Sequence, residues 1–342
     1  MKTNRPRLLD QLNQLKPGLA AKELIEQSTC FVFTGGRAYT YNAEIAVSIP
    51  TEIENIEGAV PAKELISLLQ KSDNDDVDLE MTDAGLVIKS GRYKSTLTVQ
   101  SEIRLPINEI QTPDKWQKLP EDFIEAVNVC LFSVSKDTLI KPQMNCIHCS
   151  VSYAESGSGH RLTRCCYASE KMERDILIPE NAATALCSFA PSHYATSNGW
   201  LHFRCASTLF SCRTYAEDSY PNLSQHFEET ESETTTFSFP EDMQSILDRA
   251  NVFADIDKGT YSKNSVTVAL SEKEMLVTTK GNSGFYEEAI PIQFSGEPMS
   301  FKISLFYLLE FLKRRSPISV MVDTKKMRLT SGGLTHIIAL QK

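Results

Sequence analysis

The chain has 342 residues, of which 41% are hydrophobic and 23% charged, and its formal net charge is -9. A single hydrophobic core rarely grows past about 250 residues, so we expect two or three packed domains. The acidic balance excludes a uniformly basic nucleic-acid-binding exterior, and the lack of an apolar run of about 18 residues excludes a membrane-spanning helix.

The first predicted element is an amphipathic helix in RPRLLDQLNQL, which ends at Lys16-Pro17-Gly18. After Val60-Pro61, the segment PAKELISLLQK again carries apolar residues at helical spacing. The alternating VDLEM then predicts a strand, and LVIKSGRYKSTLTV predicts a hairpin that turns at Ser90-Gly91.

The same order of elements recurs twice. LPEDFIEAVNVCLF and FPEDMQSILDRANVF each place Pro near a helix start and acidic residues in the first turn. Ile178-Pro179 then leads a helix in ENAATALCSFA, followed by a hairpin that turns at Ala206-Ser207. In the last copy FKI leads SLFYLLEFLKRRS, and after ISVMV a hairpin turns at Gly332-Gly333.

These repeats predict an α+β chain of three tandem domains, each with two helices packed on antiparallel sheets. We place the domains at residues 1–113, 114–235 and 236–342, with boundaries in the polar QTPDKWQK and the acidic EETESETTT. Each segment then has about 110 to 120 residues, an ordinary domain size. Three unrelated α+β domains that share common patterns are the alternative.

The ordered phrases resemble the bacterial DNA polymerase III beta subunit, the beta sliding clamp. They are VPAKELISLLQK and SGRYK in the first segment, SGHRL and ILIP in the second, SYPN at the second junction, and VTVALSEKEMLV, SGEPMSFKIS and FYLLEFL in the third. The resemblance covers essentially the whole chain. It implies the DNA clamp fold, a crescent that dimerises head to tail into a ring around duplex DNA.

A clamp has no catalytic residues and no cofactor. The resemblance implies that its partners are a second copy, double-stranded DNA, a replicative DNA polymerase subunit, a clamp loader and other proteins with a clamp-binding motif, all in the cytoplasm. No apolar core or small-residue cleavage site follows the basic residues of the N-terminus, so we expect no secretion signal.

Encirclement would hold the DNA, so the lining of the ring needs only mobile, sequence-independent contacts with phosphates, which Lys and Arg supply. The expected DNA-contacting residues are Arg5, Arg7, Lys16, Lys22, Lys63, Lys71, Lys313, Arg314 and Arg315. Lys22 falls where the resemblance implies a basic loop residue that contacts DNA. For each of these residues, an ordinary solvated helix charge is the alternative.

The resemblance also implies a groove between the second and third domains that binds short peptides, because a few buried anchors supply most of the affinity of a small interface. Its expected residues are Met144, Gly159, His160, Arg161, Leu162, Pro221, Tyr307, Ile337, Ile338, Ala339 and Leu340. The expected dimer interface comprises Arg92, Leu97, Val252 and Phe253, with core packing as the alternative for Phe253.

Some positions depart from the family pattern. The chain ends Ala339-Leu340-Gln341-Lys342, where the family has a Met-Pro-Met core, and Gln225, His226 and Ser304 replace an arginine, an aliphatic residue and an asparagine. We therefore expect the groove to prefer different peptides. Such departures fit a clamp carried by a phage or mobile element.

A metal site is the strongest competing motif, because Cys146-Ile147-His148-Cys149 is followed by His160 and Cys165-Cys166. The first cluster lies in the alternating MNCIHCSVSY, however, and a strand would point Cys146 and Cys149 to opposite faces, whereas structural zinc needs four converging ligands. We therefore expect no metal, and nine reduced cysteines that pack as small apolar residues.

Catalysis is not expected either. Ser158 and His160 lack a nucleophile-elbow phrase, Ser156-Gly157-Ser158-Gly159 is better explained as a tight turn, and no phosphate-binding loop is present. A second hypothesis is a clamp-fold interaction protein that binds clamp-binding peptides without closing on DNA. Basic residues on several predicted helices favour the working clamp.

Overall fold

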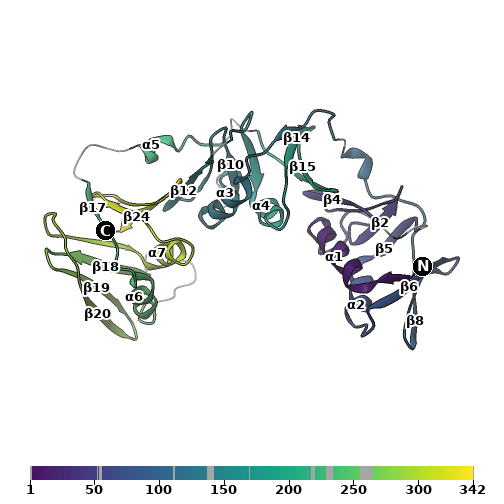
Figure 1. The fold of residues 1–342 in the computed structure, drawn as a ribbon, viewed down its shortest axis with the longest axis horizontal. Coiled ribbons are helices and arrows are strands. Elements are labelled where there is room, and N and C mark those ends of the chain that lie inside the picture. The colour runs from purple at the N-terminus through teal and green to yellow at the C-terminus, as the bar shows by residue number, and fades with distance from the viewer. Residues whose placement is uncertain are drawn as a thin grey trace. The chain divides into compact units, whose positions relative to one another are not determined.

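The computed structural model describes residues 2–51, 53, 56–110, 112–136, 142–168, 170–216, 220–228, 234–254 and 264–341. Tertiary contacts divide the chain into two compact units. Unit 1 comprises residues 1–124 and 170–216, and unit 2 comprises residues 125–169 and 217–342. Figure 1 traces the chain from the purple N-terminus to the yellow C-terminus.

One order of elements, β-α-β-β-β-β-α-β-β-β, occurs three times in the described residues. The first copy contains β1 (Lys2–Asn4), α1 (Arg5–Leu15), β2 (Cys30–Thr34), β3 (Arg37–Tyr41), β4 (Ile45–Pro50), β5 (Gly58–Pro61), α2 (Ala62–Gln70), β6 (Asp76–Thr82), β7 (Gly85–Ser90) and β8 (Tyr93–Leu97).

The second copy contains β9 (Gln117–Lys118), α3 (Phe123–Cys130), β10 (Cys146–Cys149), β11 (Tyr153–Gly157), β12 (Arg161–Cys166), β13 (Ile176–Pro179), α4 (Glu180–Leu186), β14 (His193–Ser197), β15 (Trp200–Cys205) and β16 (Thr208–Arg213). A single-turn helix, α5 (Ser224–Phe227), follows it. The predicted order of helix, strand and closing hairpin is therefore confirmed here.

The third copy contains β17 (Thr235–Phe237), α6 (Met243–Ala250), β18 (Ser265–Leu270), β19 (Glu274–Gly281), β20 (Gly284–Pro291), β21 (Met299–Ser304), α7 (Leu305–Leu312), β22 (Ser319–Val322), β23 (Lys326–Ser331) and β24 (Leu334–Gln341). The α+β fold class is confirmed. The division at 113 and 235 stays a prediction, and most of its acidic linker, residues 229–233, lies outside the described residues.

In each unit a sheet runs through the predicted domain junction. Unit 1 holds the strand order β5-β2-β3-β4-β16-β15-β14-β9, in which β4 and β16 pair antiparallel with Phe210 opposite Val47. Unit 2 holds β10-β11-β12-β24-β21-β18-β19-β20, in which β12 and β24 pair antiparallel with Leu162 opposite Ile337. A second sheet of unit 1, β1-β6-β7-β8, ends at β8.

Local sequence explains the helices. In α1 the Asn4 side chain accepts a hydrogen bond from the Arg7 N–H at 3.1 Å, and Leu8, Leu12 and Leu15 form the buried stripe. α7 begins where the Ser304 hydroxyl accepts from the Tyr307 N–H. Within each unit the two long helices of a copy pack side by side, α1 on α2 and α6 on α7 (Figure 1).

The predicted hairpin turns are present at Gly91, Ala206 and Gly332, whose φ angles of 55°, 55° and 60° are left-handed. Glycine adopts this conformation without steric cost, so Gly91 and Gly332 follow the usual turn chemistry. One predicted turn is displaced. Ser156 and Gly157 belong to β11, and the turn itself occupies residues 158–160 because the Ser158 N–H bonds to the Arg161 carbonyl at 2.8 Å.

The nine cysteines are free thiols, and six of them are buried. Cys165 and Cys187 are half-buried and Cys166 is exposed, so the prediction that all pack as core residues is wrong for Cys166. Cys166 is the last residue of β12, where the strand ends in solvent. In the part of the chain that the structure describes, no helix is long and apolar enough to cross a bilayer.

Candidate functional site

Four predicted DNA-contacting lysines belong to the α1 and α2 region of unit 1. Lys16 follows α1, Lys22 lies in the next loop, and Lys63 and Lys71 lie at the two ends of α2. All four are exposed. Within the described ranges, none of their ammonium groups forms an ion pair with a carboxylate. Their charge is therefore available to a ligand.

The two predicted arginines of α1 differ from each other. Arg7 is exposed, whereas the Arg5 side chain is only 18% exposed. The Arg5 guanidinium donates to the Leu69 carbonyl at 3.3 Å and to the Asn74 carbonyl at 2.7 Å. It therefore satisfies a carbonyl left open at the end of α2, and this contact fixes α1 against α2.

The three predicted basic residues of unit 2 are ion-paired. Lys313 lies 3.3 Å from Asp248 of α6, Arg314 lies 3.9 Å from Glu310, and Arg315 contacts Glu125 of α3. These pairs are partly exposed, so each contributes about 1 kcal/mol or less to stability. Their main consequence is that neighbouring carboxylates offset the positive charge at the end of α7.

Unit 2 contains a cavity of about 630 Å³ at the junction of β12 and β24. It brings together seven of the residues predicted for the peptide groove: Met144, Gly159, His160, Arg161, Leu162, Ile337 and Ala339. The remaining four, Pro221, Tyr307, Ile338 and Leu340, are not among its lining residues. Ile338 is fully buried in the core, since it alternates with Ile337 along β24.

Seven further lining residues were not predicted: Ser158, Leu223, His226, Asp323, Thr324, Lys325 and Lys326. In the sequence, His226 stands out only as a departure from the family pattern. Asp323, Thr324 and Lys325 form the turn between β22 and β23, and Lys326 begins β23; the Asp323 carboxylate accepts from the N–H groups of Lys325 and Lys326 at 2.6 and 2.7 Å. The turn itself could be predicted from the sequence, because Asp is common at hairpin turns. Its position opposite β12 could not.

Arg161 is one of the residues that line the cavity. Its guanidinium pairs with Glu310 and lies 4.3 Å from the centroid of the Tyr307 ring. Behind it, burial, with the charge of Arg161 as a second cause, lowers the pKa of His336 to about 3. His336 is therefore neutral, and its Nδ1 lies 2.8 Å from the Thr163 hydroxyl. The cavity thus combines apolar side chains, such as Met144, Leu162 and Ile337, with polar ones and with an arginine whose charge Glu310 offsets.

The segment around α5 forms one wall of the cavity. Lys326 Nζ donates to the His226 carbonyl at 2.9 Å, and Arg328 donates to the carbonyls of Phe227 and Glu228 at 2.8 and 2.9 Å. Beneath the wall, the buried Glu155 carboxylate lies 2.7 Å from Arg164 and 2.9 Å from His148. The bonds from Lys326 and Arg328 hold α5 against β23, and Arg164, which also donates to the Ser224 hydroxyl at 3.3 Å, holds it against β12.

The predicted interface residues lie next to the last strand of a sheet in each unit. Arg92 directly precedes β8, and Leu97 is the last residue of β8, which also carries Lys94. In unit 2, Val252 is 73% exposed, and half-buried Phe253 stacks on Tyr286 of β20 with ring centroids 6.2 Å apart. Phe253 therefore packs within its own unit.

No metal site is found in the described residues, since no three His, Cys, Asp or Glu side chains group suitably. Of the predicted alternative cluster, His148 Nδ1 is instead 2.9 Å from Glu155, and Cys146 and Cys149 are fully buried. Burial raises the pKa of the Cys146 thiol to about 12, so the thiol is protonated in this structure.

No family model and no curated protein matches this sequence. Solved structures do match across the whole chain. The Streptococcus pneumoniae DNA polymerase III beta chain has a TM-score of 0.83 at 16% identity, covering 100% of this chain and 99% of that one. The Pseudomonas aeruginosa sliding clamp bound to griselimycin gives 0.83 at 13%, with the same coverage. The Thermotoga maritima beta subunit gives 0.81 at 17%, covering 100% and 98%.

The chain therefore has the DNA sliding-clamp fold. Its structural neighbours are DNA polymerase III beta subunits, which confirms the resemblance that the sequence phrases carry, at the level of the fold.

Proposed function

We propose that this chain is a non-catalytic sliding clamp, in which two copies close head to tail into a ring around duplex DNA and tether a polymerase. The observation that carries the proposal is the clamp fold over the full length of the chain. Fold alone does not fix function, so the side chains must also suit the role. Such a clamp would act in the cytoplasm, where a separate loader would place it on DNA.

The open edges of the outermost strands β8 and β20 support ring closure. β8 carries Lys94 and directly follows Arg92, whereas β20 carries Glu287 and also Glu288, whose carboxylate pairs with Arg249 at 2.7 Å. Pairing β8 of one copy with β20 of the second would join opposite charges and satisfy two open strand edges. Exposed Val252 and Phe285, at 73% and 54%, lie beside β20 and on it, and would be covered at the same joint.

The mass of the protein in solution tests ring closure. Light scattering across a dilution series should give twice the chain mass of 38.3 kDa. Charge reversal at Glu287, which has no ion pair with a described residue, should shift the dilution series toward monomer, and the additional reversal of Arg92 and Lys94 should restore the dimer. A wild-type monomer at every concentration would favour the second hypothesis, a clamp-fold protein that binds peptides only.

The cavity of unit 2 supports the tethering role. We propose that it accepts apolar peptide anchors, and griselimycin, the compound bound in the Pseudomonas clamp structure, is a suitable probe. Binding should be micromolar or tighter, about -8 kcal/mol. Ala339→Arg should fill the cavity and abolish binding, whereas Ala84→Arg, on an exposed turn of unit 1, should not. Equal binding by both variants would place the probe elsewhere.

A further inference from the structure

α5 contributes to one wall of the cavity and consists of a single turn, Ser224–Phe227. The His226 N–H donates to the Leu223 carbonyl at 3.0 Å. The Glu228 N–H donates to the Ser224 carbonyl at 3.2 Å. A helix this short is not stable by itself in water, because its first turn fixes several backbone angles for few hydrogen bonds. The position of α5 is therefore set by its tertiary contacts.

The contact on the β12 side is made by the guanidinium of Arg164, whose side chain is 15% exposed. Its Cζ lies 4.0 Å from the ring centroid of Tyr153 on β11 and 4.1 Å from that of Phe227 on α5. Its Nη2 also donates to the Ser224 hydroxyl at 3.3 Å. A planar guanidinium packs on aromatic rings while it donates hydrogen bonds at its edge. Arg164 thus joins an aromatic ring of the sheet to one of α5.

Glu155 fixes this guanidinium from within the sheet. Its side chain is 2% exposed, and its Oε2 accepts from Nε and Nη2 of Arg164 at 3.0 and 2.7 Å. Its Oε1 lies 2.9 Å from Nδ1 of His148, whose ring stacks on Tyr220 with centroids 4.7 Å apart. A buried carboxylate needs such partners, because an unpaired charge in the interior is costly. The orientation of Arg164 is therefore set by the sheet, and α5 docks on it.

α5 is also held through its main chain. Lys326 and Arg328 of β23 donate to the carbonyls of residues 226–228. These bonds need no α5 side chain, whereas the contact with Arg164 depends on the Phe227 ring and the Ser224 hydroxyl. A change of Phe227 therefore weakens one of the two attachments and leaves the other intact.

The docked position of α5 shapes the cavity. Leu223, which directly precedes the helix and is 6% exposed, and His226 both belong to the lining. A Cβ on Gly157 of β11 would collide with Leu162 Cδ2 and lie 3.5 Å from Leu223 Cδ1. The glycine therefore leaves room for two leucines of the lining. A displaced α5 would remove Leu223 and open this side of the cavity.

We propose that Arg164 and Phe227 are positioning residues of the cavity, whose contact holds α5 in place and so sets the affinity for an apolar peptide anchor. This inference rests on the peptide-binding role proposed above. Neither residue is among those that line the cavity, so each acts through Leu223 and His226. A wall that is already docked avoids the ordering cost that a loose segment pays when a ligand binds.

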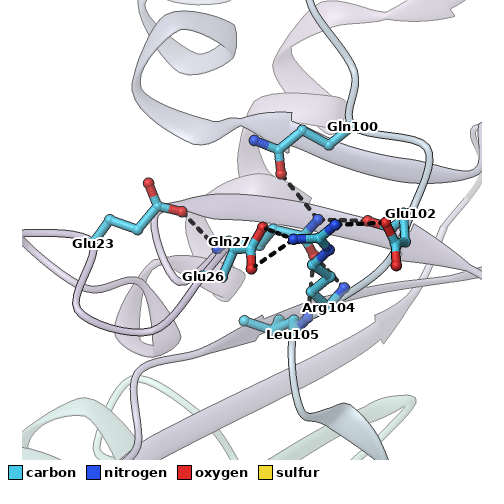
Figure 2. Close-up of polar contacts among 7 residues, drawn as sticks. All are labelled: Glu23, Glu26, Gln27, Gln100, Glu102, Arg104 and Leu105. Atoms are coloured by element: carbon cyan, nitrogen blue, oxygen red, sulfur yellow. Dashed lines mark hydrogen bonds and ion pairs between the residues drawn. The ribbon is translucent and has the colours of Figure 1, made fainter.

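Unit 1 contains a comparable buried network, centred on Gln27 (Figure 2). The amide nitrogen donates to Gln100 Oε1 at 2.9 Å and to the Glu102 carbonyl at 2.7 Å. The amide oxygen accepts from the N–H groups of Arg104 and Leu105 at 2.8 and 3.1 Å. Because these partners all belong to unit 1, a Gln27 variant controls for the general loss of a buried network.

Hydrogen exchange in the full-length protein tests the docking of α5. Phe227→Ala removes the ring but leaves the ion pair of Glu155 and Arg164 intact. We expect the amides of residues 223–228 to exchange at least about fivefold faster than in wild type, while those of β12 and β24 are unchanged. Phe227→Tyr retains a ring and should exchange like wild type. Equal exchange in Phe227→Ala and wild type would overturn the proposal. If Phe227→Ala fails to fold, Phe227→Leu decides.

The affinity for griselimycin tests the consequence for the cavity. Phe227→Ala should weaken binding about tenfold, and Phe227→Tyr should bind like wild type. Arg164→Lys keeps a charge beside Glu155 but loses the planar guanidinium, so it should also weaken binding. Gln27→Asn shortens the buried amide of unit 1 and should lower the melting temperature without changing the affinity.

An affinity of Phe227→Ala equal to that of wild type would contradict the positioning role. A tenfold loss in Gln27→Asn as well would contradict it too, because the effect would then follow from general destabilisation. If wild type does not bind griselimycin at all, the peptide-binding role of the cavity fails and this inference fails with it. If wild type binds and Phe227→Ala changes neither exchange nor affinity, only the inference fails.

Discussion

The basic residues of unit 1 and those of unit 2 are alike in sequence and differ in their surroundings. Lys16, Lys22, Lys63 and Lys71 are exposed, and none pairs with a described carboxylate. At the end of α7, Lys313, Arg314 and Arg315 each have a carboxylate partner. A count of lysines and arginines therefore overstates the positive charge that a DNA phosphate could meet, and only tertiary neighbours identify the available part.

The largest expected effect comes from removing the unit 1 set. In a variant with Ala at positions 16, 22, 63 and 71, the magnitude of the slope of log K against log salt should decrease by about 3 to 4. The variant should also bind DNA about a hundredfold more weakly, which corresponds to about 3 kcal/mol. A matched variant with Ala at positions 313, 314 and 315 should lose about one in slope or less. Equal losses, measured by salt titration on labelled duplex, would break the comparison.

One buried histidine in each unit should make the stability of the protein fall at low pH. Burial lowers the pKa of His202 in unit 1 to about 4, and burial with the charge of Arg161 lowers that of His336 in unit 2 to about 3. Unfolded histidine binds a proton near pH 6.5, so stability is complete above that pH and falls as the pH drops toward 4. Each histidine should lower the free energy of unfolding by about 2 kcal/mol when the pH falls from 7 to 5.

Urea unfolding of wild type, His202→Asn and His336→Asn at these two pH values measures this loss. Each variant should be less stable at pH 7 but should show a pH dependence about 2 kcal/mol smaller than that of wild type. An unchanged pH dependence in either variant would mean that the imidazole already binds a proton in the folded unit.

Removing the partner carboxylates should leave basic residues of unit 2 without ion pairs, as the lysines of unit 1 already are. Glu125→Gln together with Asp248→Asn leaves Arg315 and Lys313 without their ion pairs. If these cations face the DNA, the salt slope should increase by about 2 and affinity should rise about tenfold, about 1.4 kcal/mol. A double variant that binds like wild type would show that the end of α7 does not meet the duplex.

The smallest effect is expected at Arg5, which sharpens the comparison inside unit 1. Arg5→Ala should leave the salt slope unchanged, because its guanidinium is bound to the carbonyls of Leu69 and Asn74. It should instead destabilise unit 1 by about 1 kcal/mol through loss of these bonds. A slope reduced by about 0.9 without a change in melting temperature would return Arg5 to the DNA-contacting set.

The repeat and the hairpins could be predicted because their signals are local. Helical spacing in α1 and turn residues such as Gly91 and Gly332 each act within a few positions. The phrase Gly159-His160-Arg161-Leu162, predicted from the family resemblance rather than from a local signal, lies in the lining of the cavity.

The remaining features depend on neighbours that are distant in the sequence. The partners of the α7 cations lie on α6 and α3, and the 323–326 turn meets the cavity only through the pairing of β22, β23 and β24. Gln27 is an ordinary loop glutamine until residues 100–105 surround its amide. Periodicity carries no information about such pairings, so the sequence left them open.

The retention of the protein on circular duplex DNA, before and after one cut linearises the circle, tests encirclement most directly. Because a closed ring is held by topology rather than by affinity, we predict that the dimer stays on the circle in moderate salt and is lost once the DNA has free ends. Equal retention on circular and linear DNA, or loss from both at the same salt concentration, would contradict the clamp account.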